Sequence, residues 1–155
     1  MKQLFLLRHG EAGFSGGSDF QRRLTQKGVE NLERMGGVLS GRSVSVDIMY
    51  CSSAQRTLDT SDLIKNFISV KEDIFSREIY EGDMNDLLTI LEKTPFSANS
   101  CLLVGHNPTI SLLLAHLTQE NYLGLQPGMM AEVNLKISQW PMIGRGTGIL
   151  KDVLQ

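Results

Sequence analysis

The sequence is poor in cysteine and tryptophan, and it has no long apolar run. Among its 155 residues are two cysteines and one tryptophan, and only 6% are aromatic. Cys51 and Cys101 lie in short apolar segments, so we expect no disulfide framework and a reducing, cytoplasmic environment. No segment approaches the roughly 20 apolar residues that span a bilayer, and the N-terminal residues lack a signal-peptide pattern. We therefore expect no association with a membrane.

Neither sign of charge dominates the chain. Fifteen Lys and Arg residues stand against 17 Asp and Glu residues, which gives a formal net charge of -2. No polybasic run is visible, so we expect no nucleic-acid partner, and any anionic substrate must be held by local charge. The length and the 41% hydrophobic content are typical of one globular domain over residues 1–155, which we expect to be a monomer.

Apolar segments with strand and helix periodicity alternate along the chain. The expected strands cover residues 3–8, 44–50, 74–80, 101–105 and 131–137, and residues 149–154 form a final strand or a packed tail. The expected helices cover residues 25–39 with Thr25 as N-cap, 54–67, 84–93 after Asp83, and 108–117 starting at Pro108. Strict alternation over 131–137 predicts a half-exposed strand near a sheet edge. This order predicts a three-layer α/β/α sandwich with a mainly parallel central sheet.

Glycine recurs at every second position from Gly144 to Gly148. The pattern comes late in the chain, follows a strand and has no helix signal behind it. We therefore expect a turn here and not a nucleotide-binding loop.

Chemically active residues follow four of the expected strands. The first strand leads into Arg8-His9-Gly10-Glu11, the second leads to Arg56, the third ends at Glu81, and the fourth leads into Gly105-His106-Asn107. Ligands of parallel sheets bind beyond the carboxyl ends of the strands. We therefore expect two histidines, two arginines and one carboxylate to meet in one crevice.

These residue types suit the transfer of a phosphoryl group. A neutral imidazole such as His9 attacks phosphorus when its other ring nitrogen donates to a fixed acceptor. Arg8 and Arg56 provide planar forks for the charge that spreads over the phosphoryl oxygens, and they disfavour protonation of His9. A partly desolvated Glu81 at the strand end would hold a proton for the leaving group.

The same segments carry a family resemblance. Leu7-Arg8-His9-Gly10-Glu11 resembles the RHG signature of the histidine phosphatase (phosphoglycerate mutase-like) superfamily. Gly105-His106-Asn107 is similar to its second-histidine motif, and residues 52–57 resemble the segment that supplies its second arginine. Within the superfamily the chain resembles SixA-type phosphohistidine phosphatases over nearly its whole length, through Asp19 to Gly28 (D-x-x-R-x-L-T-x-x-G), Ile79-Tyr80-Glu81, Val104 to Pro108, and Trp140.

The resemblance implies a phosphoglycerate mutase-like fold and a metal-independent phosphatase without a cofactor. It implies His9 as the nucleophile, with Arg8, Arg56 and His106 forming the phosphate pocket. It further implies Glu81 as the general acid, and Arg22, Gly10 and Asn107 as substrate-binding residues. The implied substrate is a phosphohistidine-bearing protein, such as a histidine phosphotransfer domain in signal transduction. Since residues 82–100 have room for one helix only, we expect an open site that suits hydrolysis.

Four alternatives stay open at this stage. The first is a phosphatase of the same superfamily that acts on small phosphomonoesters or nucleotides. The second is a zinc site of His9, His106 and a carboxylate, against which stand the lack of an H-x-x-x-H spacing and the two arginines. The third is a cysteine phosphatase at Cys51, whose segment before Arg56 is one residue short and lacks glycine. The fourth is a phosphate-binding module that has lost activity.

Overall fold

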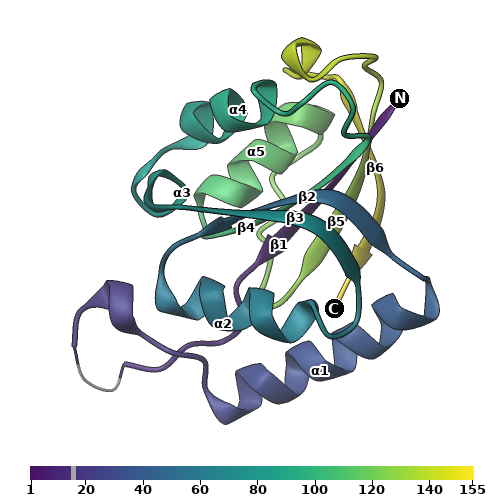
Figure 1. Cartoon of the computed structure of the whole chain (residues 1–155). Helices are drawn as coiled ribbons and strands as arrows, with labels where there is room; N and C mark the ends of the chain where they lie inside the picture. The colour runs from purple at the N-terminus through teal and green to yellow at the C-terminus, as the bar shows by residue number, and fades with distance from the viewer. Residues whose placement is uncertain (15–16) are drawn as a thin grey trace.

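A six-stranded sheet lies at the centre of the computed structural model, which describes residues 1–14 and 17–155 (Figure 1). The strands run in the order β3-β2-β4-β1-β5-β6. The first four of these pair in parallel, whereas β5 is antiparallel to β1 and β6 is antiparallel to β5. The prediction of a mainly parallel sheet is therefore confirmed. The strands are β1 (Lys2–Arg8), β2 (Ser45–Ser52), β3 (Ser69–Ser76), β4 (Ser100–Gly105), β5 (Met130–Leu135) and β6 (Gly148–Leu154).

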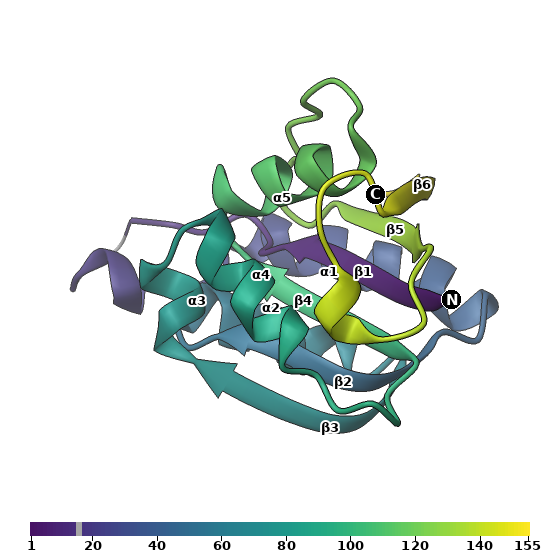
Figure 2. The same cartoon turned by 90° about the horizontal axis from the view of Figure 1, so that it is seen from above.

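Helices cover both faces of this sheet. The helices are α1 (Gln26–Gly41) and α2 (Gln55–Ile64) on one face, and α3 (Arg77–Glu81), α4 (Met84–Glu92) and α5 (Thr109–Thr118) on the other (Figures 1 and 2). Side chains of β1 alternate between the two layers: Leu4 and Leu6 pack in the core under α4 and α5, whereas Phe5 and Leu7 pack in the core under α1 and α2. The three-layer α/β/α sandwich is confirmed.

Local signals set the starts of the helices as expected. The side chain of Thr25 accepts a hydrogen bond from the amide of Gly28 at 3.0 Å and caps α1. Asp83 and Asp86 form a reciprocal capping box at the start of α4, with N···O distances of 3.1 and 2.8 Å. Pro108 is the N-cap of α5. Of the helices in the described residues, only α4 lies between residues 82 and 100, in agreement with the predicted lack of room for a large lid.

Two expectations about strands are wrong. The strand expected over 74–80 ends at Ser76, whose hydroxyl accepts from the amide of Glu78 at 3.2 Å and starts helix α3. Its true span, β3, is an edge strand with mostly exposed side chains, so no apolar run marks it. The expected half-exposed strand, β5, lies between β1 and β6 and is buried on both faces; even Glu132 is only 8% exposed.

The glycine-rich segment after residue 143 is a turn, as predicted. The amide of Thr147 donates to the carbonyl of Gly144, and Gly146 has a positive φ of 73° that favours glycine. The chain then enters β6, so the final residues form a strand. No helix in the described parts of the chain is long and apolar enough to cross a membrane.

Candidate active site

The carboxyl ends of β1, β2 and β4 bring the predicted residues together. Arg8 pairs with Gly105 across β1 and β4, and the amide of His9 donates to the carbonyl of Gly105 at 3.1 Å. His9 and His106 therefore leave neighbouring strands side by side, with ring centroids 5.3 Å apart. Arg56 is the second residue of α2, just after β2, and its charge reaches both imidazoles.

His9 is held as a neutral imidazole of one tautomer. Its Nδ1 lies 2.7 Å from the carbonyl oxygen of Gly10, which only accepts hydrogen bonds, so Nδ1 carries the proton and Nε2 keeps a lone pair. The pKa of His9 is lowered from its ordinary 6.5 to about 4, chiefly by burial and also by the positive charges of Arg56, Arg8 and Arg22, while the hydrogen bond to the Gly10 carbonyl acts in the opposite direction. A neutral ring with a free lone pair is what a nucleophile at phosphorus requires.

The two arginines are anchored to the backbone through one end of each guanidinium. Arg8 Nη1 donates to the carbonyl of Leu125 at 2.9 Å, and Arg56 Nη1 donates to the carbonyl of Asp19 at 2.8 Å. The Nε atoms of both side chains are buried without a hydrogen-bond partner. Across the described residues, one other buried side-chain nitrogen or oxygen atom lacks a partner, and it is Nδ1 of His106. All three unpartnered atoms thus belong to residues predicted to hold a phosphoryl group.

His106 contacts two side chains, Ser52 and Tyr80, for which no role was predicted from sequence. Its Nε2 lies 2.7 Å from Oγ of Ser52, and the ring of Tyr80 meets it edge-on with centroids 5.5 Å apart. The pKa of His106 is lowered from 6.5 to about 3, chiefly by burial and also by electrostatic interaction with His9 and Arg56. His106 is therefore neutral across the physiological pH range.

The exposed carboxylate of Asp19 links Arg56 to Arg22. Asp19 lies in the short helix η1 (Asp19–Gln21), which contacts α2. Its carboxylate accepts from Arg56 Nη2 at 3.2 Å, Arg22 Nη1 at 3.1 Å and the hydroxyl of Tyr80 at 2.7 Å. The hydrogen bonds from Tyr80 and Arg22 lower the pKa of Asp19 to about 2. Phe20 packs edge-on against Tyr80, with centroids 4.8 Å apart. Asp19 and Tyr80 lie within the family motifs, and no function was predicted for either residue.

Glu81 does not occupy the position expected from sequence. It is the last residue of α3 and not the end of a strand, and its side chain is 61% exposed. Its Oε1 accepts a hydrogen bond from Arg77 Nε at 2.7 Å, one helical turn earlier. The expected partial desolvation of this carboxyl group is therefore wrong, because the last turn of α3 directs it to an exposed ion pair.

The three residues expected to bind substrate use their polar groups within the protein. The amide of Gly10 donates to Thr60 Oγ1 at 3.1 Å, and its carbonyl accepts from His9. Asn107 donates to the carbonyl of Leu125 at 2.8 Å and accepts from Ser111. Arg22 donates to the carbonyls of Gly13 and Ala12 as well as to Asp19, and its guanidinium lies 4.0 Å from the centroid of the exposed Phe14 ring.

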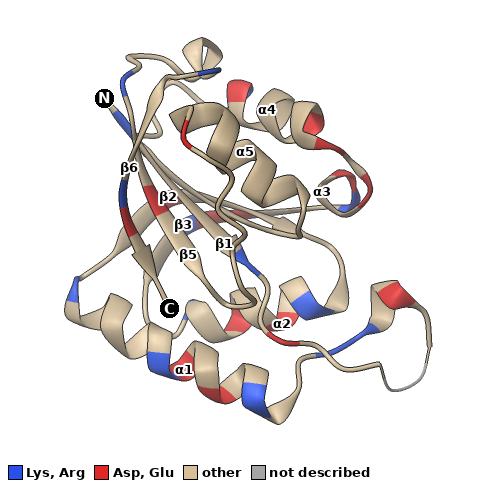
Figure 3. Ribbon diagram, turned by 180° about the vertical axis from the view of Figure 1, so that it is seen from behind, with Lys and Arg blue, Asp and Glu red and all other residues tan. Residues whose placement is uncertain are grey.

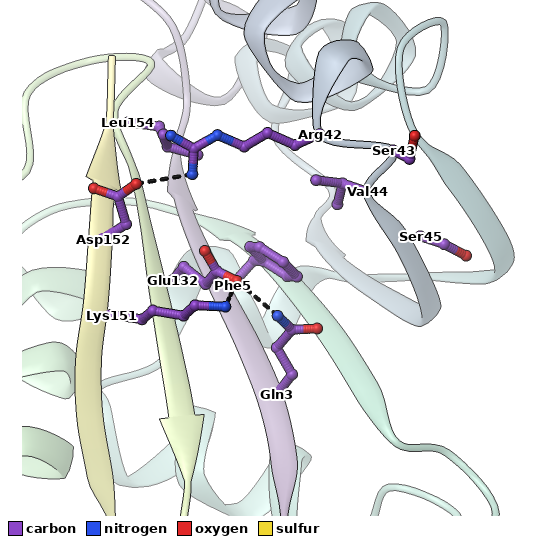
Figure 4. Close-up of a pocket in the computed structure, with 10 residues that line it drawn as sticks. All are labelled: Gln3, Phe5, Arg42, Ser43, Val44, Ser45, Glu132, Lys151, Asp152 and Leu154. Carbon is purple, nitrogen blue, oxygen red and sulfur yellow. Dashed lines mark hydrogen bonds and ion pairs between the residues drawn. The ribbon is translucent and has the colours of Figure 1, made fainter.

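Charge elsewhere on the protein is mixed and largely self-paired. Acidic and basic residues are mixed along α1 (Figure 3). A hollow of about 450 Å³ beside β1, β5 and β6 is lined by charged side chains that point toward one another (Figure 4). Arg42 pairs there with Asp152 at 2.8 Å, and Glu132 accepts from Gln3 at 2.7 Å and faces Lys151 at 3.6 Å. These pairs leave no free charge aimed into the hollow.

The zinc and cysteine alternatives gain no support. In the described part of the chain, no three His, Cys, Asp or Glu side chains are grouped to hold a metal ion. Cys51 is fully buried in the core between α1, α2 and the sheet, and burial raises its thiol pKa to about 12. The thiolate that nucleophilic attack requires is therefore not formed near neutral pH.

Comparison with known proteins identifies the family of this chain. The chain is 26% identical over 121 residues to phosphohistidine phosphatase SixA of Escherichia coli (strain K12), covering 74% of this chain and 73% of that protein. A structure from Nakamurella multipartita assigned as a SixA phosphohistidine phosphatase superposes with a TM-score of 0.81 at 26% identity, covering 99% of this chain and 95% of that one. The protein histidine phosphatase SixA in complex with tungstate gives a TM-score of 0.85 at 24% identity, covering 99% and 96%. The family model for the histidine phosphatase superfamily (branch 1) matches residues 4–96, more than half of the chain, and the chain therefore belongs to this superfamily.

Proposed function

We propose that this protein is a metal-independent phosphatase that removes phosphoryl groups from histidine side chains of a phosphotransfer protein, through a phosphohistidine intermediate at His9. One observation carries the proposal: three buried nitrogens lack a hydrogen-bond partner among the described residues, and they belong to Arg8 and Arg56, whose charges act on His9, and to His106, whose ring centroid lies 5.3 Å from that of His9. Buried N–H groups without partners are costly, and a phosphoryl group brings three oxygens that accept from such donors. The tungstate bound to the similar SixA structure is likewise a tetrahedral oxyanion.

In the first step the lone pair of His9 Nε2 forms a bond to phosphorus. The bond from phosphorus to the substrate's imidazole nitrogen breaks, and its electron pair leaves with that nitrogen. If the other nitrogen of the substrate ring is protonated, the leaving group is a neutral imidazole. In the second step water forms a bond to phosphorus, the electron pair returns to His9 Nε2, and the proton from water passes to phosphate or solvent.

The acid–base character of the site supports phosphohistidine as the substrate. An alkyl phosphate releases an alkoxide unless an acid protonates it, whereas phosphohistidine leaves as an imidazole. Asp19, the carboxylate that contacts Arg56, has a pKa of about 2 and holds no proton at neutral pH. The exposed Glu81 is paired with Arg77. Among the described residues that line the two imidazoles, none is a carboxylic acid prepared to donate a proton.

A matched pair of peptides tests the proposal. Two peptides of one sequence, carrying phosphohistidine or phosphoserine at the same position, are compared by kcat/KM in the presence of a chelator. We expect a preference for phosphohistidine of at least about a hundredfold, since general acid help that the serine ester needs is worth about 10²- to 10⁴-fold. Equal rates, or faster hydrolysis of phosphoserine, would favour a general phosphomonoesterase.

The covalent intermediate is tested separately. Acid-sensitive, base-stable label should appear on His9 when wild-type protein is given labelled substrate and quenched with base, and His9→Ala should neither form it nor turn over. Activity that a chelator abolishes and a divalent metal restores would contradict the metal-independent mechanism.

A further inference from the structure

Ser52 is a buried hydroxyl that contacts the second histidine of the site and has no assigned role. It is the last residue of β2 and is fully buried. Cys51 pairs with Val104 across β2 and β4, so Ser52 follows its side of this pair by one position and His106 follows the other side by two, and Ser52 Oγ lies 2.7 Å from His106 Nε2. The contact is therefore built into the register of the parallel sheet.

The hydrogen bonds around Ser52 fix the direction of this contact. Its Oγ accepts from the amide of Ala54 at 3.2 Å. A hydroxyl also has one proton to donate, and in a buried position that proton needs an acceptor. The one acceptor that Ser52 Oγ contacts in the described residues is His106 Nε2. Ser52 therefore donates to Nε2, and the proton of the neutral His106 ring lies on Nδ1.

The two histidines of the site therefore present different ring nitrogens: His9 presents a lone pair and His106 presents an N–H group. The carbonyl of Gly10 holds the proton of His9 on Nδ1 and leaves the Nε2 lone pair free. Ser52 occupies the Nε2 lone pair of His106 and leaves Nδ1–H, which is buried and has no partner among the described residues. We infer that Ser52 is a positioning residue that fixes His106 as an N–H donor to a phosphoryl oxygen. This inference rests on the proposed function for the identity of the group that Nδ1–H meets.

The tautomer itself can be measured without any assay of activity. Nitrogen-15 NMR of histidine-labelled wild-type protein near neutral pH should show His106 protonated on Nδ1. In Ser52→Ala the Nδ1–H signature should weaken, and the pKa of His106 should rise, because a hydrogen bond that favours the neutral ring is lost. The titratable groups that face His106 are His9, Arg8, Arg56 and Asp19, and this substitution changes none of them.

Kinetics of the same variants give a second measurement. Ser52→Ala should lower kcat on the phosphohistidine peptide about tenfold, with KM within about twofold, because the donor acts on charge that develops in the transition state. Ser53→Ala is the matched control: it removes the neighbouring hydroxyl, which forms no hydrogen bond among the described residues, and it should keep the wild-type tautomer and rate.

The outcomes separate this inference from the proposed function. A wild-type His106 protonated on Nε2 overturns the inference whatever the activity, and this measurement stands even if Ser52→Ala does not fold. A folded Ser52→Ala with an unchanged tautomer and pKa also overturns it. A wild-type protein that shows the Nδ1–H tautomer but does not hydrolyse phosphohistidine contradicts the proposed function and leaves the role of Ser52 in orienting His106 intact.

Discussion

Mild acid should destabilise the folded protein, because its two site histidines are buried as neutral rings. The pKa of His9 is about 4 and that of His106 about 3, whereas both are near 6.5 in an unfolded chain. Between these values the unfolded chain binds protons that the folded protein does not. The contribution of the two neutral histidines to the free energy of unfolding is therefore fully present above pH 6.5, and it is lost progressively as the pH falls toward 4 and 3.

The magnitude follows from these values. At pH 5 each histidine lowers the free energy of unfolding by about 2 kcal/mol relative to pH 8, so the pair lowers it by about 4 kcal/mol. This is a large part of the roughly 5–15 kcal/mol that stabilises an ordinary domain. Carboxylates act in a different range: Asp19 has a lowered pKa, so its contribution is present above its ordinary value of 3.8 and is lost only below it. The window from pH 8 to pH 5 thus isolates the histidines.

Urea unfolding followed by circular dichroism at pH 8, 7, 6 and 5 measures this effect. The wild type should lose about 4 kcal/mol across the window, His9→Asn or His106→Asn about half of that, and the double variant almost nothing. In a His116→Gln control, which leaves both site histidines in place, the decline should persist. Constant wild-type stability across the window, or an undiminished decline in the double variant, would refute the reasoning.

Three further substitutions test the charges of the site. Arg56→Lys should lower kcat/KM about a hundredfold, because a point charge cannot replace the planar fork; a rate within fivefold of wild type would contradict this. Glu81→Gln should leave the rates on phosphohistidine and phosphoserine peptides within about twofold, since the carboxylate is exposed and paired with Arg77; a loss confined to phosphoserine would make it an acid. Asp19→Asn should tighten competitive inhibition by inorganic phosphate about threefold or more, because it removes a carboxylate from Arg56; weaker inhibition would mean that Asp19 chiefly orders the arginines.

The layered fold was predictable because its central strands are long apolar runs. Strands β1, β2 and β4 are buried on both faces, and their side chains fill the two cores. The edge strand β3 was not predictable in the same way, since exposure leaves its residues free to be polar. Instead, Ile79 and Tyr80 suggested a longer strand. Both residues lie in the short helix α3, and this helix places the side chain of Ile79 in the core. The polar residues of β5 suggested an exposed face, but Glu132 is buried there because Gln3 and Lys151 on the adjacent strands are its partners.

The meeting of His9, Arg8, Arg56 and His106 was predictable from one rule, that parallel strands end at the same edge of a sheet. The contacts of Asp19, Tyr80 and Ser52 were not, because they depend on the path of a loop, on a helix where a strand was expected, and on the relative register of β2 and β4. The spacing of residues along the sequence does not predict contacts of this kind. The position of Glu81 was predicted wrongly because the expected strand was continued to residue 80, whereas helix α3 begins at Arg77.

The low basicity of His9 has opposite effects on the two steps of the proposed reaction. A less basic nitrogen is a weaker nucleophile but a better leaving group, as is established for thiols. The carbonyl of Gly10 offsets the first effect by holding the attacking lone pair on Nε2. In the second step the phosphorus–nitrogen bond breaks to give back a neutral ring already protonated on Nδ1, so His9 needs no acid to leave. A substrate whose own leaving group is an imidazole makes the first step chemically similar to the second. The same donors of Arg8, Arg56 and His106 then serve both steps, and an acid at position 81 is not required.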